Sequence, residues 1–412
     1  TVFSSLHNNL FLLTKNIYLF ILKYEVMKKL LIIHTKYRNI GGEDIAVTNE
    51  INYFSKYFNV KVVYFDNSKF QFKNDFLAFL TNTNTFSNKK LKEEIDSFKP
   101  DFAIVHNTWF KANLGIFQVL KANNIKTFIK IHNYRYFCTY SFSSKKHLRG
   151  DITCPACGFK KKKFQIFNKY FDESYVKSFV AIIYGKRYID ILTDSEIQIL
   201  VLTNNHKHFI SKFLDLNDSV YVFPNILEVE IKNLDLSNQD NEDYLIYAGR
   251  LSEEKGVREL IENFLDIKIN NLNLKIVGEG PEKKLLEEQY KDHKRIKFLG
   301  YLNNNEVKRE ILGSLAVVTA TKLFEGQPTL LTEASKLAKP SIFPDAGGIA
   351  EFFPENYNYK FTQFDYDDLK IKINNLYKSN NYNQVGKENK KFIDTYLDEE
   401  KLMQDFIRFV QT

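Results

Sequence analysis

Two glutamates, Glu325 and Glu333, stand eight positions apart in the stretch "FEGQPTLLTEASKLAKP", residues 324–340. Pro328 between them suits the first position of a helix. At ~1.5 Å per helical residue, the two carboxylates could be roughly 10 Å apart, about the reach from a sugar to a ribose across a diphosphate. The plainer interpretation makes Glu325 a partner of the helix dipole and Glu333 a surface residue. Such a helix start offers free backbone N–H groups to an anion, here those of Gln327, Thr329 and Leu330.

Two cations follow another expected strand, in "YAGRLSEEKG". Arg250 and Lys255 would lie around a helix start, where cations and free N–H groups together bind a diphosphate. A solvated charge cluster is the alternative. In "KIVGEGPEKKLLEE", Gly278 and Gly280 would let the backbone approach a ligand closely, or form a plain tight turn.

The N-terminal half offers a glycine pair and a histidine. Gly41 and Gly42 follow the first expected strand, but G-x-G-x-x-G is missing, which excludes the dinucleotide fingerprint. His132 ends a strand in "IKIHNYRYFC", where a histidine either acts near a reacting group or is structural. We favour a functional His132 over a functional His106, which ends the strand expected at 101–106.

The cysteines are spaced C-x15-C-x2-C, at Cys138, Cys154 and Cys157. A structural zinc site normally needs four ligands, and His147 is the available fourth. We favour reduced thiols and expect no metal, with zinc as the alternative. The absence of a disulfide framework and of a secretory signal favours a cytoplasmic setting.

From Met27 onward, short apolar runs alternate with segments of helical spacing, which predicts an α/β protein with two Rossmann-like parallel sheets. Ligands bind such sheets at the carboxyl ends of the strands. The expected strands are 30–34, 60–65, 101–106, 126–132, 198–203 and 220–225, followed by 244–249, 273–278, 296–301, 315–320, 340–344 and 359–361.

These patterns predict a succession of domains. We expect residues 1–26 to be translated upstream sequence, with a membrane-surface amphipathic helix as the alternative. The other predicted segments are a first domain at 27–225 with a Cys-containing insertion at 133–165, a linker at 226–240, a second domain at 241–390, and a final helix at 391–412.

The formal net charge of +8 suits an anionic partner, such as a nucleotide or a membrane surface. Nucleic acid is disfavoured because the chain has neither a long basic arm nor an aromatic-basic RNA motif. The run "FKKKKF" at 159–164 either touches anionic lipid, which would suit a lipid-linked acceptor, or forms a solvated loop.

Five motifs stand in order over roughly residues 244–355: "GRLSEEKG", "VGEGP", "FLGYL", "EGQPTLLTEA" and "DAGGIAEF". Together they resemble the donor domain of the GT-B glycosyltransferases of family 4. The resemblance implies a GT-B fold, in which two Rossmann-like domains face an interdomain cleft. It also implies a nucleotide-diphosphate sugar as donor substrate, with no structural metal and no further cofactor required.

The resemblance implies a role for each motif residue. Arg250 and Lys255 would hold the diphosphate, Glu325 would face the donor sugar, and Glu333 would bind the ribose hydroxyls. Many relatives carry Phe-Gly where this chain has Gln327-Pro328, and proline has no N–H to offer a phosphate.

Two N-terminal features also match the family. Gly41 and Gly42 resemble its acceptor-domain glycine loop, and a histidine at the place of His132 lies near the reacting sugar. The final helix often packs back on the first domain in this fold.

The resemblance therefore implies a retaining, hexosyltransferase-type enzyme of bacterial cell-surface polysaccharide or lipopolysaccharide synthesis. Its acceptor would be a glycan or a lipid-linked hydroxyl, met at the inner face of the cytoplasmic membrane. The alternatives are a nucleotide-sugar epimerase of the same fold and a non-catalytic sugar-nucleotide-binding subunit.

Overall fold

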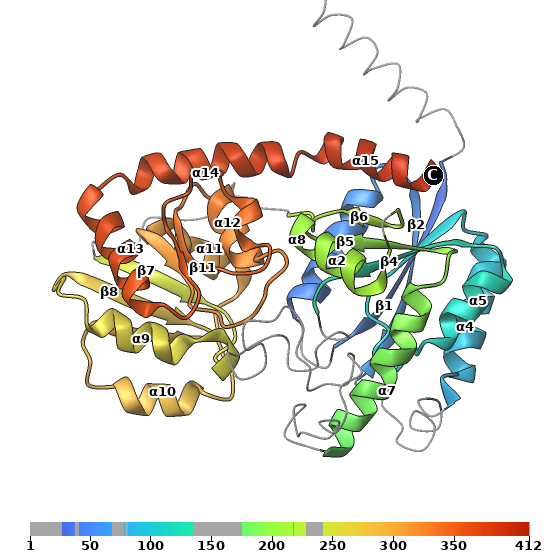
Figure 1. Ribbon diagram of the computed structural model, residues 1–412, viewed down its shortest axis with the longest axis horizontal. Helices are drawn as coiled ribbons and strands as arrows, with labels where there is room; N and C mark the ends of the chain where they lie inside the picture. The colour runs from blue at the N-terminus through green and yellow to red at the C-terminus, as the bar shows by residue number, and fades with distance from the viewer. Residues whose placement is uncertain are drawn as a thin grey trace, which may run out of the picture. The chain divides into compact units, whose positions relative to one another are not determined.

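The computed structural model describes residues 27–37, 41–67, 78, 81–134, 175–216, 218–227 and 242–411. The chain divides into two compact units (Figure 1). The first unit takes the residues up to Ile131 together with Arg187–Leu200, and the second takes His132–Lys186 and Val201–Thr412. The three cysteines, the "FKKKKF" run and residues 1–26 lie outside the described residues.

The first sheet has the strand order β2-β1-β3-β4-β5-β6. Its parallel pairs include β1 with β2, β1 with β3, and β3 with β4. The run Leu30–Ile33 is fully buried, as expected for a strand whose two faces are both covered. The strands are β1 (Lys29–Lys36), β2 (Asn59–Asp66), β3 (Phe102–Val105), β4 (Lys126–Ile131), β5 (Ile197–Val201) and β6 (Val220–Val222).

Helices alternate with these strands along the chain. They are α2 (Gly42–Phe54), α4 (Thr85–Phe98), α5 (Gly115–Ala122), α7 (Tyr175–Leu192) and α8 (Asn204–Leu214). The Asn84 side chain caps α4 by accepting a hydrogen bond from Ser87 N, and Thr203 caps α8 by accepting one from His206 N. Such caps satisfy N–H groups that a helix start leaves without a partner.

The second sheet has the order β12-β11-β10-β7-β8-β9, and every neighbouring pair is parallel. Figure 1 shows α9 on one side of this sheet and α12 with α14 on the other. The strands are β7 (Asp243–Ala248), β8 (Leu272–Val277), β9 (Ile296–Gly300), β10 (Ala316–Val318), β11 (Ser341–Asp345) and β12 (Lys360–Thr362). Its helices are α9 (Val257–Leu265), α10 (Lys283–Tyr290), α11 (Asn304–Gly313), α12 (Thr329–Lys336), α13 (Tyr366–Ser379), α14 (Tyr382–Tyr396) and α15 (Glu399–Gln411), with 3-10 turns η3 (Glu253–Lys255) and η4 (Ile349–Phe352).

The predicted fold class is confirmed, since each expected strand is present and the strands form two parallel sheets. The differences are local. Pro328 is the N-cap of α12 and not its first helical residue. The C-terminal helical segment is interrupted at Leu397, so α14 and α15 are separate helices.

Helix α15 brings two aromatic rings to β6. Phe409 stacks on Tyr221 with ring centroids 4.4 Å apart, and Phe406 lies 5.4 Å from Phe223. Within the described part of the chain, no helix combines the length and the apolar character needed to cross a bilayer.

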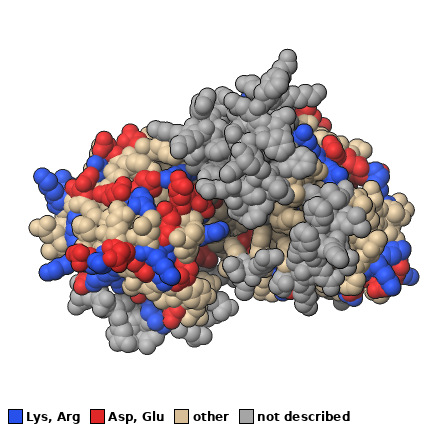
Figure 2. Space-filling model, turned by 90° about the horizontal axis from the view of Figure 1, so that it is seen from below, with Lys and Arg blue, Asp and Glu red and all other residues tan. Residues whose placement is uncertain are grey.

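Charged side chains are paired both inside and outside. In the first unit, Glu50 of α2 and Lys130 of β4 form a fully buried ion pair, and His106 Nε2 lies 3.6 Å from the Glu50 carboxylate. Burial raises the pKa of Glu50 and lowers the pKa of Lys130. On the face that Figure 2 displays, acidic and basic side chains of the described residues are interspersed.

Candidate functional site

Lys255 and Glu325 meet at the carboxyl ends of two adjacent strands of the second sheet. Lys255 Nζ lies 2.6 Å from Glu325 Oε1, and Thr321 Oγ1 donates to the same oxygen at 3.3 Å. Lys255 follows β7 and Glu325 follows β10, which pair directly. Both side chains are partly exposed, at 29% and 25%. The structure therefore brings together an ammonium and a carboxylate where a ligand can reach them.

The loops that carry this pair are held together by their backbones. Lys322 N donates to Glu254 O at 2.9 Å, and the Lys322 ammonium lies 2.6 Å from the Glu259 carboxylate of α9. These contacts join the turn that contains Lys255 to the segment that leads into Glu325. The ion pair is thus built on two mutually braced loops, as a preorganised site requires.

Arg250 is exposed just after β7, and its carbonyl accepts a hydrogen bond from Tyr247 Oη at 2.9 Å. Tyr247 is buried, and its pKa is raised first by that burial and then by Glu325, Glu254 and Glu282. Carboxylates therefore surround the phenol below Arg250. Sequence reasoning missed Tyr247, although it lies two residues before the "GR" dipeptide, at the end of the expected strand.

Gly278 and Gly280 lie against the backbone of the segment that follows β7. Gly278 has φ +139°, and a Cβ on it would lie 1.9 Å from the carbonyl oxygen of Gly249. A Cβ on Gly280 would lie 2.1 Å from the carbonyl oxygen of Leu251. Close approach was expected at both positions, and the structure shows that the neighbouring strand end is what approaches. A direct ligand contact at these glycines stays a prediction.

Helix α12 begins at Thr329, one residue after the N-cap Pro328. Thr329 and Leu330 occupy the first two positions of the helix, where N–H groups have no acceptor within the helix. The Gln327 side chain, by contrast, is buried and bonds the backbone of Asn225 through both of its polar atoms, at 2.6 and 3.1 Å. That partner was not foreseen.

Glu333 lies one turn into α12 and is partly buried. Burial raises the pKa of its carboxyl to about 7, and the positive charge of Lys308 opposes this rise. Desolvation disfavours the charged form, so the carboxyl titrates near neutral pH. Glu333 is thus half-buried, and its role in binding the ribose stays a prediction.

His132 follows β4, and its carbonyl oxygen lies 3.8 Å from the place of a Cβ on Gly326, the residue after Glu325. Tyr134, two residues further on, is buried, and burial followed by Glu351 and Glu325 raises its pKa. The structure therefore places the backbone of His132 beside Gly326, the residue that follows Glu325. Tyr134 was not singled out from the sequence.

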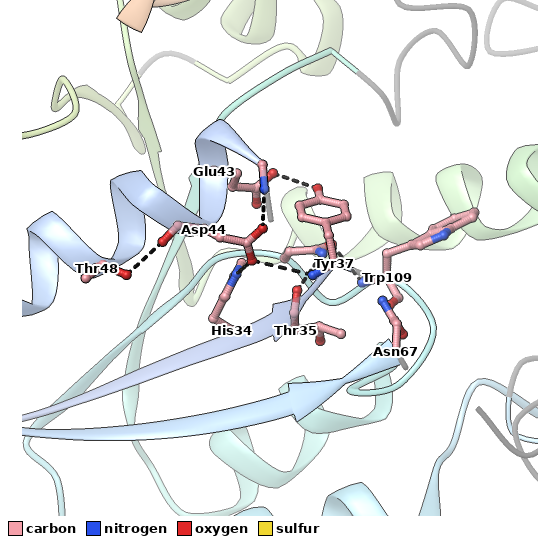
Figure 3. A network of polar contacts seen from close by, with 10 residues as sticks. His34, Thr35, Tyr37, Glu43, Asp44, Thr48, Asn67 and Trp109 are labelled. Atoms are coloured by element: carbon pink, nitrogen blue, oxygen red, sulfur yellow. Dashed lines mark hydrogen bonds and ion pairs between the residues drawn. The ribbon is translucent and has the colours of Figure 1, made fainter. Parts of the chain in front are cut away.

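Gly41 and Gly42 belong to the other unit, where Gly41 is the N-cap of α2. Figure 3 shows Asp44 of this helix pointing toward His34 and Tyr37. Asp44 Oδ2 accepts from Gly41 N at 2.9 Å, and Asp44 Oδ1 is 2.9 Å from His34 Nε2. Tyr37 N donates to the same Oδ1 at 3.4 Å. One carboxylate thus fixes the backbone on both sides of residues 38–40. The signal was an acidic residue three places after the cap.

Two other candidates fall elsewhere. His106 lies in the buried cluster with Glu50 and Lys130, which gives it a structural setting. Among the described residues, no three His, Cys, Asp or Glu side chains are grouped as a metal site. The zinc alternative concerned Cys138, Cys154 and Cys157, which the structure does not describe.

Residues 230–392 match the protein family described as "Glycosyl transferases group 1". The amylovoran biosynthesis glycosyltransferase AmsD of Erwinia amylovora is 27% identical over 165 residues, which cover 39% of this chain and 46% of that protein. The chain thus spans less than half of this curated relative.

Solved structures resemble nearly the whole chain. Sucrose-phosphate synthase from Thermosynechococcus elongatus has a TM-score of 0.67 at 13% identity, covering 93% of this chain and 98% of that one. HepE from Anabaena, in complex with UDP and glucose, has a TM-score of 0.64 at 12% identity, covering 94% of this chain and 100% of that one. At such identities the likeness shows the fold alone, and that fold is GT-B.

Proposed function

We propose that the chain is a retaining glycosyltransferase of the group 1 family, whose model matches residues 230–392. Its donor is a nucleotide-diphosphate sugar, and its acceptor is a hydroxyl of a glycan or of a lipid-linked glycan. The observation that carries the proposal is the Lys255–Glu325 contact at the carboxyl ends of β7 and β10. Parallel sheets bind ligands at that edge.

The donor diphosphate is bound by cations and by N–H groups. Lys255, Arg250 and the first turn of α12 supply them, and a charge of two or more on the phosphates competes for the ammonium that Glu325 otherwise holds. When Lys255 turns to the phosphate, the Glu325 carboxylate is released to accept hydrogen bonds from sugar hydroxyls. Glu333 then accepts from the ribose hydroxyls.

In the transfer step, the bond from the anomeric carbon to the phosphate oxygen breaks and a bond to the acceptor oxygen forms on the same face. The acceptor proton passes to the departing phosphate oxygen, so the reaction is balanced without a covalent enzyme intermediate. The charge that develops on the leaving diphosphate is stabilised by Lys255 and Arg250. His132 orients a hydroxyl of the donor sugar.

The acceptor assignment follows the relatives. The similarity to an amylovoran biosynthesis glycosyltransferase supports a role in a bacterial surface polysaccharide or lipopolysaccharide. A net charge of +8 supports contact with the anionic inner face of the cytoplasmic membrane, where lipid-linked acceptors are met.

A donor screen tests the proposal. The melting temperature is measured with UDP, GDP, ADP and their hexose derivatives, because a ligand that binds only the folded state at 100 times its Kd stabilises it by about 2.7 kcal/mol. Uridine, guanosine and adenosine, which lack phosphates, are the controls. Equal shifts with nucleoside and nucleoside diphosphate would contradict a diphosphate site.

Labelled donor then identifies the reaction. We expect the transferred sugar to keep the anomeric configuration, axial or equatorial, that it has in the donor. NMR of the product measures that configuration. An isomerised sugar nucleotide formed without acceptor would identify an epimerase. Donor binding without transfer to any glycan or lipid-linked acceptor would identify a non-catalytic subunit.

A further inference from the structure

Glu351 caps the start of α8 from a distant part of the chain. Its Oε2 accepts from Asn204 N at 2.7 Å and from Asn204 Nδ2 at 3.1 Å, while Oε1 accepts from Asn205 N at 2.7 Å. Thr203 Oγ1 accepts from the next N–H, that of His206, at 3.0 Å. A carboxylate on the positive end of a helix makes charge-assisted hydrogen bonds. The first N–H groups of α8 are therefore bound by the 3-10 turn η4.

Gln327 makes a second connection to the same stretch of chain. Its Oε1 accepts from Asn225 N at 2.6 Å, and its Nε2 donates to Asn225 O at 3.1 Å. The amide thus satisfies both backbone groups of one residue, as a paired strand would. Both residues are buried, at 7% and 6% exposure, so the pair is shielded from competing water.

These two connections flank Glu325. On one side, Gly348 N donates to Glu325 O at 2.9 Å, and a Cβ on Gly348 would lie 2.4 Å from Thr203 Oγ1. Gly348 is thus packed between the backbone of Glu325 and the cap of α8, one residue before η4 begins. On the other side, Gln327 is two residues after Glu325. The Glu325 backbone is held through both neighbours, while its carboxylate meets Lys255.

We propose that Gln327 and Glu351 are positioning residues that fix the Glu325 loop, residues 324–330, against the segment 203–225. We call this pair of connections the clasp. The inference rests on the proposed function, because it takes Glu325 as the group that faces the donor sugar. Neither side chain touches the donor. Each acts through the backbone of Glu325, and a displacement of about 1 Å in a reacting group can cost about 10²-fold in rate.

The raised pKa of Tyr134 supports this geometry. After burial, the carboxylates that raise it are Glu351 and Glu325, in that order. The Tyr134 Oη lies 3.5 Å from Asn205 Oδ1 at the start of α8, the helix that Glu351 caps. Tyr134 and Glu351 thus both contact the start of α8.

Hydrogen exchange in the ligand-free protein tests the clasp directly. Glu351→Ala should speed exchange of the Asn204 and Asn205 amides and also of amides in 324–330. Glu351→Gln, which keeps one acceptor oxygen, should give a smaller change. Glu355→Ala removes an exposed carboxylate four positions away and should change neither region. Faster exchange confined to α8, with 324–330 unchanged, would overturn the proposal.

Gln327→Met keeps the length of the side chain and removes both hydrogen bonds to Asn225. It should also speed exchange in 324–330. The matched control is Gln384→Met, which removes an exposed amide that bonds only Glu388 one turn along α14 at 2.8 Å. These measurements need no donor, so they test the clasp whatever sugar the enzyme uses.

Kinetics then separate the clasp from the proposed function. With whichever of UDP-glucose, GDP-mannose and ADP-glucose the wild type consumes, Gln327→Met and Glu351→Ala should lower kcat by about 10²-fold. The KM for the donor and the Kd for the free nucleoside diphosphate should stay near the wild-type values, since Lys255 and Glu333 are untouched. Retained kcat in both variants would refute the clasp. If Lys255→Ala and Glu325→Ala also retain their rates, the proposed function falls instead.

Discussion

Replacing Lys255 by alanine removes the ammonium that lies 2.6 Å from the Glu325 carboxylate. We expect a large loss of turnover with little loss of stability. The pair is partly exposed, at 29% and 25%, and such pairs contribute about 0–1 kcal/mol to folding. The variant should therefore melt within a few degrees of the wild type, since ~1 kcal/mol corresponds to roughly 2–4 °C in a domain of this size.

The effect on catalysis is larger because the ammonium serves a charge that grows during the reaction. A hydrogen bond to a charged group contributes about 1.5–3 kcal/mol, or about 10- to 150-fold in rate at 1.4 kcal/mol per decade. Removing one donor that is aimed at developing charge costs about 10²–10³-fold in characterised enzymes. Lys255→Ala should thus lower kcat by about 10²–10³-fold, and Glu325→Ala, which removes the group facing the sugar, by a similar factor.

The assay is transfer from labelled donor at saturating concentration, with the melting temperature of each variant measured in parallel. The matched control is Lys336→Ala. Lys336, the last residue of α12, is 19% exposed and its ammonium lies 2.9 Å from the Asp394 carboxylate. Lys336→Ala therefore removes a comparable ion pair away from the Lys255–Glu325 contact. That variant should keep the wild-type kcat. Normal turnover in Lys255→Ala and Glu325→Ala, with normal melting temperatures, would refute the site assignment.

Three further predictions concern charge and packing. The pKa of Glu333 is raised to about 7, so its carboxylate, the better hydrogen-bond acceptor, predominates only above that pH. The affinity for UDP, measured by calorimetry, should therefore rise about tenfold as the pH increases through 7. Glu333→Gln should flatten this rise. A rise that persists unchanged in Glu333→Gln would assign it to the phosphate. Lys130→Met should lower the free energy of unfolding in urea by about 3–5 kcal/mol, because Glu50 loses its buried ion pair. The double variant Lys130→Met/Glu50→Gln should recover part of that stability. If it recovers none, lost packing and not the buried charge causes the effect. Gly278→Ala should lower stability and donor affinity together, since its Cβ would meet the Gly249 carbonyl at 1.9 Å, and a variant with normal melting and binding would contradict the packing described here.

The strands were predictable because their signal is local. Runs such as "LLII" at 30–33 and "LAVV" at 315–318 are short and apolar on both faces, which is typical of strands inside a covered parallel sheet. Element ends were less predictable, because caps depend on single residues. Pro328 suits either the N-cap or the first helical position, and the structure uses it as the cap.

The candidate site was predictable where it rests on motif residues and unpredictable where it rests on contacts across the chain. The Lys255–Glu325 pair joins two motifs that the sequence analysis had already assigned to one ligand. The partner of Gln327 stands 102 positions away, and the partner of Glu351 stands 147 positions away. No local pattern in the sequence encodes contacts over such separations. A role was therefore expected only for the backbone N–H of Gln327, and the structure adds the contact of its side chain with Asn225.

The rings that α15 lays on β6 have a consequence for how the chain matures. β6 is the outermost strand of the first sheet and has only three residues, Val220–Val222. Tyr221 of β6 and Phe223, the residue after it, contact Phe409 and Phe406 of α15. The first sheet therefore keeps an uncovered aromatic border until α15 has been synthesised. A truncation before α15 should leave a product that self-associates through this border, even though every residue of the sheet is present.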